Sequence, residues 1–398
     1  MVGKDQIDVA IVGAGPYGTS LALNLKAAGM SYRVFGKPMD TWINHMPPGM
    51  FLKSEGNASD IYDPTGYDLS KYCAERNIPW KAVTLPVPLQ VFCDYGMNRY
   101  NTLGATADMR QVTSVAQDGS GFRLVLDDGS EVKAKRVVLA VGITHFAHIP
   151  EEFQAIKTPL IKHSSEHGDL NQYKGKEVAI VGGGSSATDL GLTLAEAGAD
   201  VTVIARQEVK WTAKRSEKRK LWVRMRWPDS CMGPGIKARL FEKNPHRLRT
   251  VLNAETRYHY MRNFAGPAGA WQIREAFEKK VCEVEHTKVS KIQEVGGQLA
   301  IDLTSDDGQK KQLVVDQLFT ATGYRANLGR LPFLDKTLLD KIEQFNNTPV
   351  LSTFFESSIP GLYFVGNASA VSFGPLMRFV CGTPYTSQRL TPHLKAAA

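Results

Sequence analysis

The 398-residue sequence predicts an α/β fold of two related parallel-sheet modules, with a mostly helical insertion in the second. Two observations support this prediction. A strand, a glycine turn and a helical stretch occupy residues 8–29, and residues 177–206 repeat this unit without a gap. A three-stranded meander with a D-D-G turn, then an apolar strand that leads to a glycine, follows each unit, at residues 112–142 and at residues 289–323. Similarity at two matching places indicates two copies of one module.

The first unit, DVAIVGAGPYGTSLALNLKAAG, carries glycines in the order G-x-G-x-x-G between strand and helix. The first glycine permits a sharp turn, the second lets the backbone approach a pyrophosphate, and the third allows close helix–strand packing. The start of the helix then offers N–H groups to the anion. The unit therefore predicts a Rossmann-like dinucleotide-binding turn formed by Gly13, Gly15, Pro16, Tyr17 and Gly18.

The second unit, EVAIVGGGSSATDLGLTLAEAGADVTVIAR, places two glycines and an alanine at the positions of these three glycines. It predicts a second dinucleotide-binding turn, formed by Gly182, Gly184, Ser185, Ser186 and Ala187. Two such sites in one chain indicate two redox carriers.

The residue after the second strand of each module indicates how the ribose of the dinucleotide is held, because an acidic side chain at this place usually binds a ribose hydroxyl. Gly36 takes this place in the first module and is followed by Lys37. In the second module the place is taken by Ala205, which repels no phosphate, and Arg206 follows. A guanidinium can grip a 2′-phosphate with two charge-assisted hydrogen bonds. We therefore expect NADPH to be preferred, with NADH as the alternative.

The predicted domains divide the chain into a first module of residues 1–155 and 320–398 and a second of residues 156–319. Residues 207–285 are predicted to be the insertion, a lid or substrate segment. This segment holds four of the six tryptophans, and it has helical patterns near residues 236–240 and 271–281. Near the C-terminus, Thr383 is expected to cap a helix that has Pro384 at its first position.

The net charge of +8 is unevenly distributed. Residues 206–262 hold sixteen Lys and Arg against five Asp and Glu, so the chain is not a uniformly basic nucleic-acid binder. The basic stretch is either a solvated face or an anion site. The sequence shows no signal peptide, membrane span, metal-ligand cluster or C-x-x-C pair, and we expect a cytoplasmic protein. The sequence is compatible with a homo-oligomer.

Four segments carry a family resemblance: GAGPYG, GGGSSA, ATGY at 321–324 and YFVGNA at 363–368. They resemble the flavoproteins with two dinucleotide-binding domains, which include disulfide-reductase-like enzymes and class B flavoprotein monooxygenases. The resemblance implies FAD on the first module and NAD(P)H on the second, and a C-terminal segment that covers the flavin. It also implies cofactor-binding roles for seven residues outside the two turns: Lys37, Trp42, Gly142, Gly323, Gly366, Asn367 and Thr383. For Trp42 the alternative is simple core packing.

Within that superfamily the segment 50–72 is similar to a segment of the amino-acid N-hydroxylases, in which a lysine lies beside the substrate. Lys53 matches that lysine and could anchor a substrate carboxylate; the alternative is a surface lysine. Asn57 could donate a hydrogen bond to the oxygenated flavin. Of the flavin-containing monooxygenase fingerprint only His163 and the following Ser164 are present, which disfavours the Baeyer–Villiger subgroup.

The resemblance implies an FAD- and NAD(P)H-dependent monooxygenase that uses O2 and a C(4a)-hydroperoxyflavin. Its small substrate would be a nucleophile such as an amine, a sulfide or a nitrogen heterocycle. One alternative is a flavin reductase that passes electrons to a protein or quinone. Another is a non-enzymatic sensor of flavin or NADPH.

Overall fold

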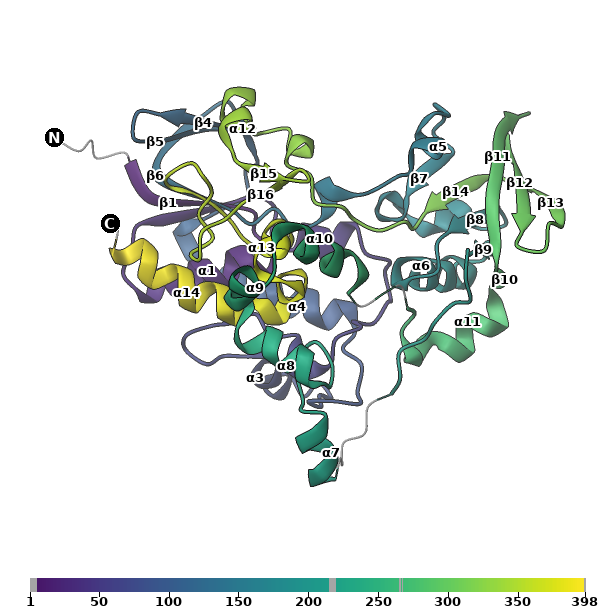
Figure 1. Cartoon of the computed structure of the whole chain (residues 1–398), viewed down its shortest axis with the longest axis horizontal. Helices are drawn as coiled ribbons and strands as arrows, with labels where there is room; N and C mark the ends of the chain where they lie inside the picture. The colour runs from purple at the N-terminus through teal and green to yellow at the C-terminus, as the bar shows by residue number, and fades with distance from the viewer. Residues whose placement is uncertain (1–5, 215–219, 265, 267, 397–398) are drawn as a thin grey trace.

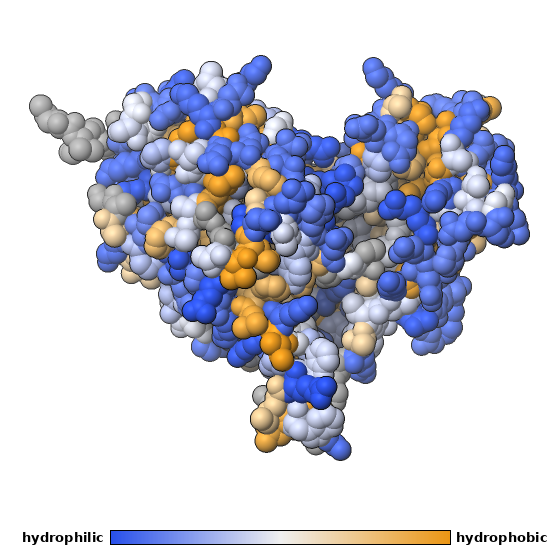
Figure 2. Space-filling model, in the orientation of Figure 1, coloured by the Kyte–Doolittle hydropathy of each residue, from blue (hydrophilic) through white to orange (hydrophobic). Residues whose placement is uncertain are grey.

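The computed structural model describes residues 6–214, 220–264, 266 and 268–396. Two lobes are visible in Figure 1: the N-terminal and C-terminal parts of the chain share one lobe, and the strands from the middle of the chain, with α6 and α11, form the other. The molecular surface is notched between the lobes (Figure 2). The two-module α/β architecture predicted from the sequence is confirmed.

The first lobe is built on a seven-stranded sheet in the order β3-β2-β1-β6-β5-β4, in which β17 also pairs with β6. Strand β1 is parallel to β2 and β6, so Val12 lies beside both Phe35 and Leu139 and the three strands end at one edge. The strands are β1 (Gln6–Val12), β2 (Tyr32–Phe35), β3 (Ala107–Asp108), β4 (Val112–Asp118), β5 (Gly121–Leu126), β6 (Glu131–Leu139) and β17 (Leu362–Phe364).

Helices pack against this sheet and against one another. Helix α14 packs on α1, and Gly382, just before α14, lies against Tyr17 of the first glycine turn. An apolar cluster beneath residues 41–97 is formed largely by α3, α4 and the loops around them. The helices of this lobe are α1 (Pro16–Ala27), α2 (Asp40–Asn44), α3 (Leu69–Glu75), α4 (Leu89–Asn101), α12 (Lys336–Lys341), α13 (Ala370–Phe373) and α14 (Thr383–Ala396), and a small two-stranded sheet joins β15 (Gln344–Phe345) to β16 (Thr348–Pro349).

The predicted N-cap role of Thr383 is wrong. Its φ of −60° and ψ of −40° are helical, and α14 begins at this residue. A short 3₁₀ turn, Val380–Gly382, leads directly into the helix and sets its start. The Thr383 hydroxyl instead accepts from the Tyr62 N–H at 3.2 Å and donates to the Asp60 carbonyl at 3.3 Å, which ties α14 to the 41–77 segment.

The second lobe contains a parallel five-stranded sheet in the order β10-β9-β8-β14-β7. Helix α6 follows β8 just as α1 follows β1. The predicted run of strands after the second unit forms a separate antiparallel sheet and then leads into β14. The elements are α5 (Glu151–Gln154), β7 (Ile161–His163), β8 (Glu177–Val181), α6 (Ser185–Glu196), β9 (Asp200–Ile204), β11 (Thr287–Val295), β12 (Gln298–Ser305), β13 (Lys310–Val315) and β14 (Gln317–Thr320).

The segment predicted as an insertion has two parts with different neighbours. Its first part forms α7 (Leu221–Arg226), α8 (Ile236–Lys243), α9 (Leu248–Val251) and α10 (Ala254–Asn263), and α10 packs on α13 of the first lobe. Its last part belongs to the second sheet: α11 (Arg274–Lys280) packs on α6, and β10 (Cys282–Val284) pairs with β9. Phe277 of α11 is fully buried there. The projecting insertion is therefore shorter than residues 207–285.

Candidate active site

The first glycine turn leaves open space at one glycine only. A Cβ on Gly13, whose φ is +112°, would overlap the Ala140 carbonyl, and a Cβ on Gly18 would overlap the Gly13 carbonyl. No atom lies within 4 Å of a Cβ placed on Gly15, the residue that precedes α1. Packing therefore requires the first and third glycines, and the space beside the second fits a pyrophosphate at the helix N-terminus.

The end of β2 lies beside this turn and carries no acidic side chain. A Cβ on Gly36 would lie 3.9 Å from the Gly13 Cα, and the following Lys37 is exposed. The adenosine ribose that would lie here therefore meets a glycine and a lysine where related folds often supply a carboxylate.

Tyr17 connects the first turn to the C-terminal segment. Its hydroxyl donates to the Phe379 carbonyl at 2.8 Å, and its ring lies 3.4 Å from a Cβ placed on Gly366. Gly366 follows β17 with a φ of +68°, and Asn367 after it is half-buried. The predicted residues of the YFVGNA segment thus reach the same edge of the sheet as the G-x-G-x-x-G turn.

Two further predicted cofactor residues, Gly142 and Trp42, have different surroundings. Gly142, three residues beyond the end of β6, has a φ of +65°, and a Cβ there would lie 3.4 Å from the Thr41 hydroxyl. Trp42 packs edge-on against Phe92, with ring centroids 4.7 Å apart, within the apolar cluster under residues 41–97. This contact supports core packing as the role of the Trp42 ring.

The second glycine turn repeats the geometry of the first. Gly182 has a φ of +143°, and a Cβ there would overlap the carbonyl of Ala321, just as Gly13 meets Ala140. Helix α6 begins at Ser185 directly after Gly184, and Ala187 is fully buried. Ser186 is half-buried in the first turn of the helix. An anion fits at this N-terminus for the same physical reason as at α1.

The residues after β9 and β14 border the second turn. Ala205 is buried and its Cβ lies 3.5 Å from a Cβ placed on Gly183, whereas Arg206 is exposed. The carbonyl of Gly323, beyond β14, lies 3.1 Å from His163 Nε2, and Nδ1 of that ring lies 2.8 Å from the Ser165 hydroxyl. Both nitrogens of His163 are thus engaged within the protein, which indicates a structural role.

Both modules and the insertion meet at one backbone oxygen. The Ala268 carbonyl accepts a hydrogen bond from Lys53 Nζ at 2.9 Å and another from the Ser185 hydroxyl at 2.9 Å. Lys53 comes from the first module, and Ser185 begins the helix of the second glycine turn. The predicted residue Asn57 lies four positions after Lys53, is exposed, and donates its backbone N–H to the Ala82 carbonyl.

Two charged side chains that the sequence did not single out act on Lys53. Burial raises the pKa of Asp189 on α6 to about 7, and the charge of Lys53 opposes this shift. One carboxylate oxygen of Asp189 is buried with no hydrogen-bond partner. Burial lowers the pKa of Lys53, Asp189 raises it, and Arg378 lowers it further. Burial also lowers the pKa of Arg378 itself.

A signal for Asp189 does exist in the sequence, because it follows Ser185 by four residues and therefore shares its helix face. No feature of the local sequence identifies Arg378, because only the fold of the C-terminal segment brings it close to Lys53. Lys53, Asp189 and Arg378 together form a cationic cluster where the modules meet, in which Asp189 is buried and Lys53 and Arg378 keep exposed surface. Two cations beside one carboxyl group suit an anionic group on a substrate.

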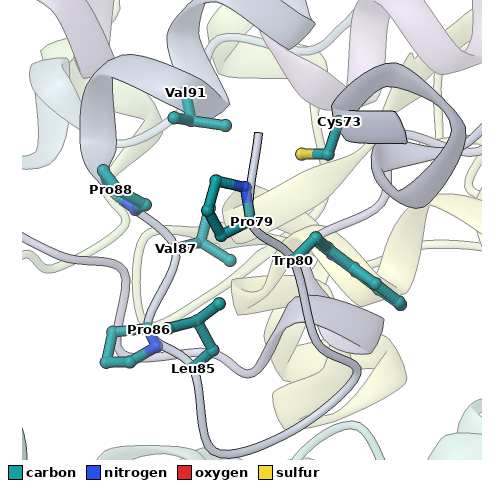
Figure 3. A pocket seen from close by; sticks show the side chains of 8 residues that line it. All are labelled: Cys73, Pro79, Trp80, Leu85, Pro86, Val87, Pro88 and Val91. Carbon is teal, nitrogen blue, oxygen red and sulfur yellow. The ribbon is translucent and has the colours of Figure 1, made fainter. Parts of the chain in front are cut away.

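A small apolar pocket opens elsewhere, beneath the loop that follows α3 (Figure 3). None of the residues predicted for cofactor or substrate lines it, so it is not the candidate site. Its lining residues are Cys73, Pro79, Trp80, Leu85, Pro86, Val87, Pro88 and Val91.

The described part of the chain lacks two other kinds of feature. No group of three or more His, Cys, Asp or Glu side chains there could hold a metal ion. No helix among the described residues is long and apolar enough to cross a membrane.

The family model for pyridine nucleotide-disulphide oxidoreductases matches residues 7–221. The chain therefore belongs to this family. The ferredoxin–NADP reductase of Thermus thermophilus is 27% identical over 219 residues, which are 52% of this chain and 55% of that protein. The chain thus matches about half the length of its curated relatives.

Solved structures match the whole chain at low identity. The ornithine N-hydroxylase of Kutzneria sp. 744 has a TM-score of 0.78 and 16% identity, over 98% of this chain and 99% of that one. The L-lysine 6-monooxygenase of Pseudomonas syringae has a TM-score of 0.75 and 15% identity, over 99% and 100%. The predicted class, a flavoprotein oxidoreductase with two dinucleotide-binding modules, is confirmed.

Proposed function

We propose that the protein is an FAD- and NADPH-dependent monooxygenase that transfers one oxygen atom of O2 to a small nucleophilic substrate. The substrate class that we favour is an amine, followed by a sulfide or a nitrogen heterocycle. The observation that carries this proposal is the meeting of both modules and the insertion at the Ala268 carbonyl. A site bordered by three parts of the chain would hold a small substrate between two cofactors and limit the access of water.

The two glycine turns are assigned to different cofactors. The turn Gly13–Gly18 and the N-terminus of α1 would hold the pyrophosphate of FAD, with Gly366 and Asn367 beside it. The turn at Gly182 and the exposed Arg206 would hold NADPH. When bound, FAD supplies the redox chemistry: it accepts a hydride from NADPH and activates dioxygen.

Lys53 is assigned to the substrate. Its ammonium group is partly dehydrated, and a carboxylate on the substrate would restore the interactions that it lost with water. Arg378 adds positive field, which favours an anionic group in the same cleft. Asn57, on the same segment, is proposed as a hydrogen-bond donor to the reacting oxygen. The insertion acts as the wall that excludes solvent from the reaction.

A flavin reductase that passes electrons to a protein is the second candidate. The 27% identity with a ferredoxin–NADP reductase over half of the chain favours it. A non-enzymatic sensor remains as the third. All five cysteines are free, which fits a protein of the reducing cytoplasm.

Substrate-dependent coupling separates these candidates. The FAD-loaded protein is given NADPH and air with L-ornithine, L-lysine, the corresponding diamines or a thioether, and NADPH, hydrogen peroxide and oxygenated product are measured. A monooxygenase makes product in proportion to the NADPH consumed with one of these substrates. Rapid reduction of ferredoxin or a quinone without oxygenated product would favour the reductase. No NADPH oxidation with any acceptor would favour the sensor.

A further inference from the structure

The projecting part of the insertion exposes several large apolar side chains. On α7, Leu221 is 73% exposed, Trp222 64% and Met225 76%. Trp227 at the end of α7 and the α8 residues Ile236 and Leu240 are each more than half exposed. We call these six side chains the tip surface. Scattered single apolar residues are normal on a protein surface, whereas a contiguous group indicates an interaction site.

The spacing of the side chains puts them on continuous faces. Leu221 and Trp222 lie four and three residues before Met225, so the three share one face of α7, and Ile236 and Leu240 share one face of α8. The Trp227 ring lies 3.7 Å from a Cβ placed on Gly235, which joins the two helices. In Figure 1 α7 projects from the bottom of the molecule, and Figure 2 shows apolar surface on that projection.

Positive charge surrounds the tip surface. Between residues 220 and 247 the sequence holds seven Lys and Arg against two Asp and Glu. Exposed basic side chains on and around α7 and α8 include Lys220, Arg226, Lys237, Lys243 and Arg247. Of the two acids, Glu242 accepts from the Cys231 N–H at 3.2 Å and lies 3.6 Å from Arg239.

We propose that the tip surface docks on an anionic lipid membrane. Tryptophan, leucine and methionine side chains enter the boundary between headgroups and acyl chains, while lysine and arginine pair with anionic headgroups. This is surface binding by a short projection, and it agrees with the finding that no described helix is long and apolar enough to span a bilayer.

A second copy of the chain is a poorer partner for this surface. A two-fold contact places the same patch against itself, so the five exposed basic side chains of each copy would face those of the other. Such like-charge contacts oppose association, whereas an anionic bilayer neutralises them. The proposal concerns location and is independent of the proposed monooxygenase function.

Vesicle co-sedimentation of the FAD-loaded full chain tests the proposal. The chain should bind vesicles of phosphatidylglycerol and phosphatidylcholine more than tenfold better than vesicles of phosphatidylcholine alone, and 0.5 M NaCl should abolish the difference. The double variant Leu221→Ser/Trp222→Ser should bind at least tenfold more weakly. Lys237→Glu should weaken binding to anionic vesicles about fivefold.

The control is Val295→Ser, which removes a 63% exposed apolar side chain from the strand β11 of the other lobe. Its vesicle binding should equal that of the parent. Flavin content and melting temperature verify that every variant is folded. Equal binding to neutral and anionic vesicles, or no binding, would overturn the proposal. So would sedimentation showing that the parent is a dimer which the double variant dissociates, because the tip surface would then bind a second copy.

Discussion

The ammonium group of Lys53 and the carboxyl group of Asp189 belong to different modules, yet each stabilises the charged form of the other. Burial drives the pKa of Asp189 up to about 7 and the pKa of Lys53 down, and their mutual attraction opposes both shifts. The charge of the cleft therefore changes near neutral pH. A substrate or nicotinamide entering the cleft meets a group that can be either protonated or ionised.

The first prediction concerns stability. Asp189→Asn keeps the shape and removes the ionisation, so it should stabilise the protein at neutral pH. The folded pKa of about 7 lies above the ordinary 3.8, so the parent loses stability as the pH rises between these values. Relative to the variant the loss should be about 1.4 kcal/mol per pH unit, with no further loss above pH 7.

Denaturant unfolding at pH 5, 6, 7 and 8 measures this difference. Asp340→Asn makes the same change at an exposed position and serves as the control. A parent and an Asp189→Asn variant whose stabilities run parallel from pH 5 to 7 would show that Asp189 ionises normally in the folded state.

The second prediction assigns a substrate group to Lys53. Lys53→Gln should raise KM for a carboxylate-bearing amine by roughly tenfold or more, because a charged hydrogen bond contributes about 1.5–3 kcal/mol. KM for the same amine without its carboxyl group should change less than twofold. Flavin content should stay constant, and Lys395→Gln, at an exposed position of α14, is the control. An equal rise in both KM values would mean that Lys53 shapes the cleft without binding the carboxylate.

The third prediction separates fold from cofactor at the first glycine turn. The space beside Gly15 is open, so Gly15→Asp should leave the fold intact. The added carboxylate would lie against the pyrophosphate and should remove most of the FAD. The ratio of flavin to protein absorbance in the purified protein measures this, with circular dichroism as the check on folding. Ser120→Asp, at an exposed position beside β4, is the charge control. Full flavin content in Gly15→Asp would place FAD elsewhere.

The fourth prediction concerns the choice of nicotinamide. Arg206→Ala should weaken the use of NADPH by roughly tenfold, the equivalent of one charged hydrogen bond, and leave the use of NADH unchanged. The measurement is kcat/KM for flavin reduction with each nucleotide. Arg226→Ala removes another exposed arginine, on α7, and should change neither value. A parent that prefers NADH would contradict the assignment.

The fifth prediction concerns the wall of the cleft. Backbone bonds join Thr212 N–H to the Gly269 carbonyl at 2.9 Å and Gly269 N–H to the Lys210 carbonyl at 2.7 Å, so a short linker can replace residues 213–267. The shortened protein should bind FAD and turn most of its NADPH oxidation into hydrogen peroxide, because water reaches the reacting centre. A peroxide assay beside product analysis measures the split. Unchanged coupling would remove the insertion from the active site.

The features predicted best from the sequence were those with a local cause. Each glycine turn is specified by glycines within a stretch of six residues, 13–18 in the first module and 182–187 in the second. The ungapped repeat then identified the second turn from the first. The helix face of Asp189 could be predicted from its spacing to Ser185, but neither its burial nor the position of Arg378 could, because both depend on how the two modules and the C-terminal segment come together. The same holds for the end of the insertion. The helical pattern near residues 271–281 predicted α11, but it did not predict that α11 packs on α6 or that β10 pairs with β9 in the second sheet.

The Ala268 carbonyl has a mechanical consequence. This oxygen links the two lobes, because the two side chains that donate hydrogen bonds to it belong to separate lobes. A hinge rotation that swings the lobes apart must break at least one of these two hydrogen bonds. Helix α10 packs on α13 of the first lobe, whereas Gly269 is joined by backbone bonds to Lys210 and Thr212 of the second. Opening of the lobes therefore separates the α7–α10 part of the insertion, which follows the first lobe, from the segment at Gly269, which follows the second.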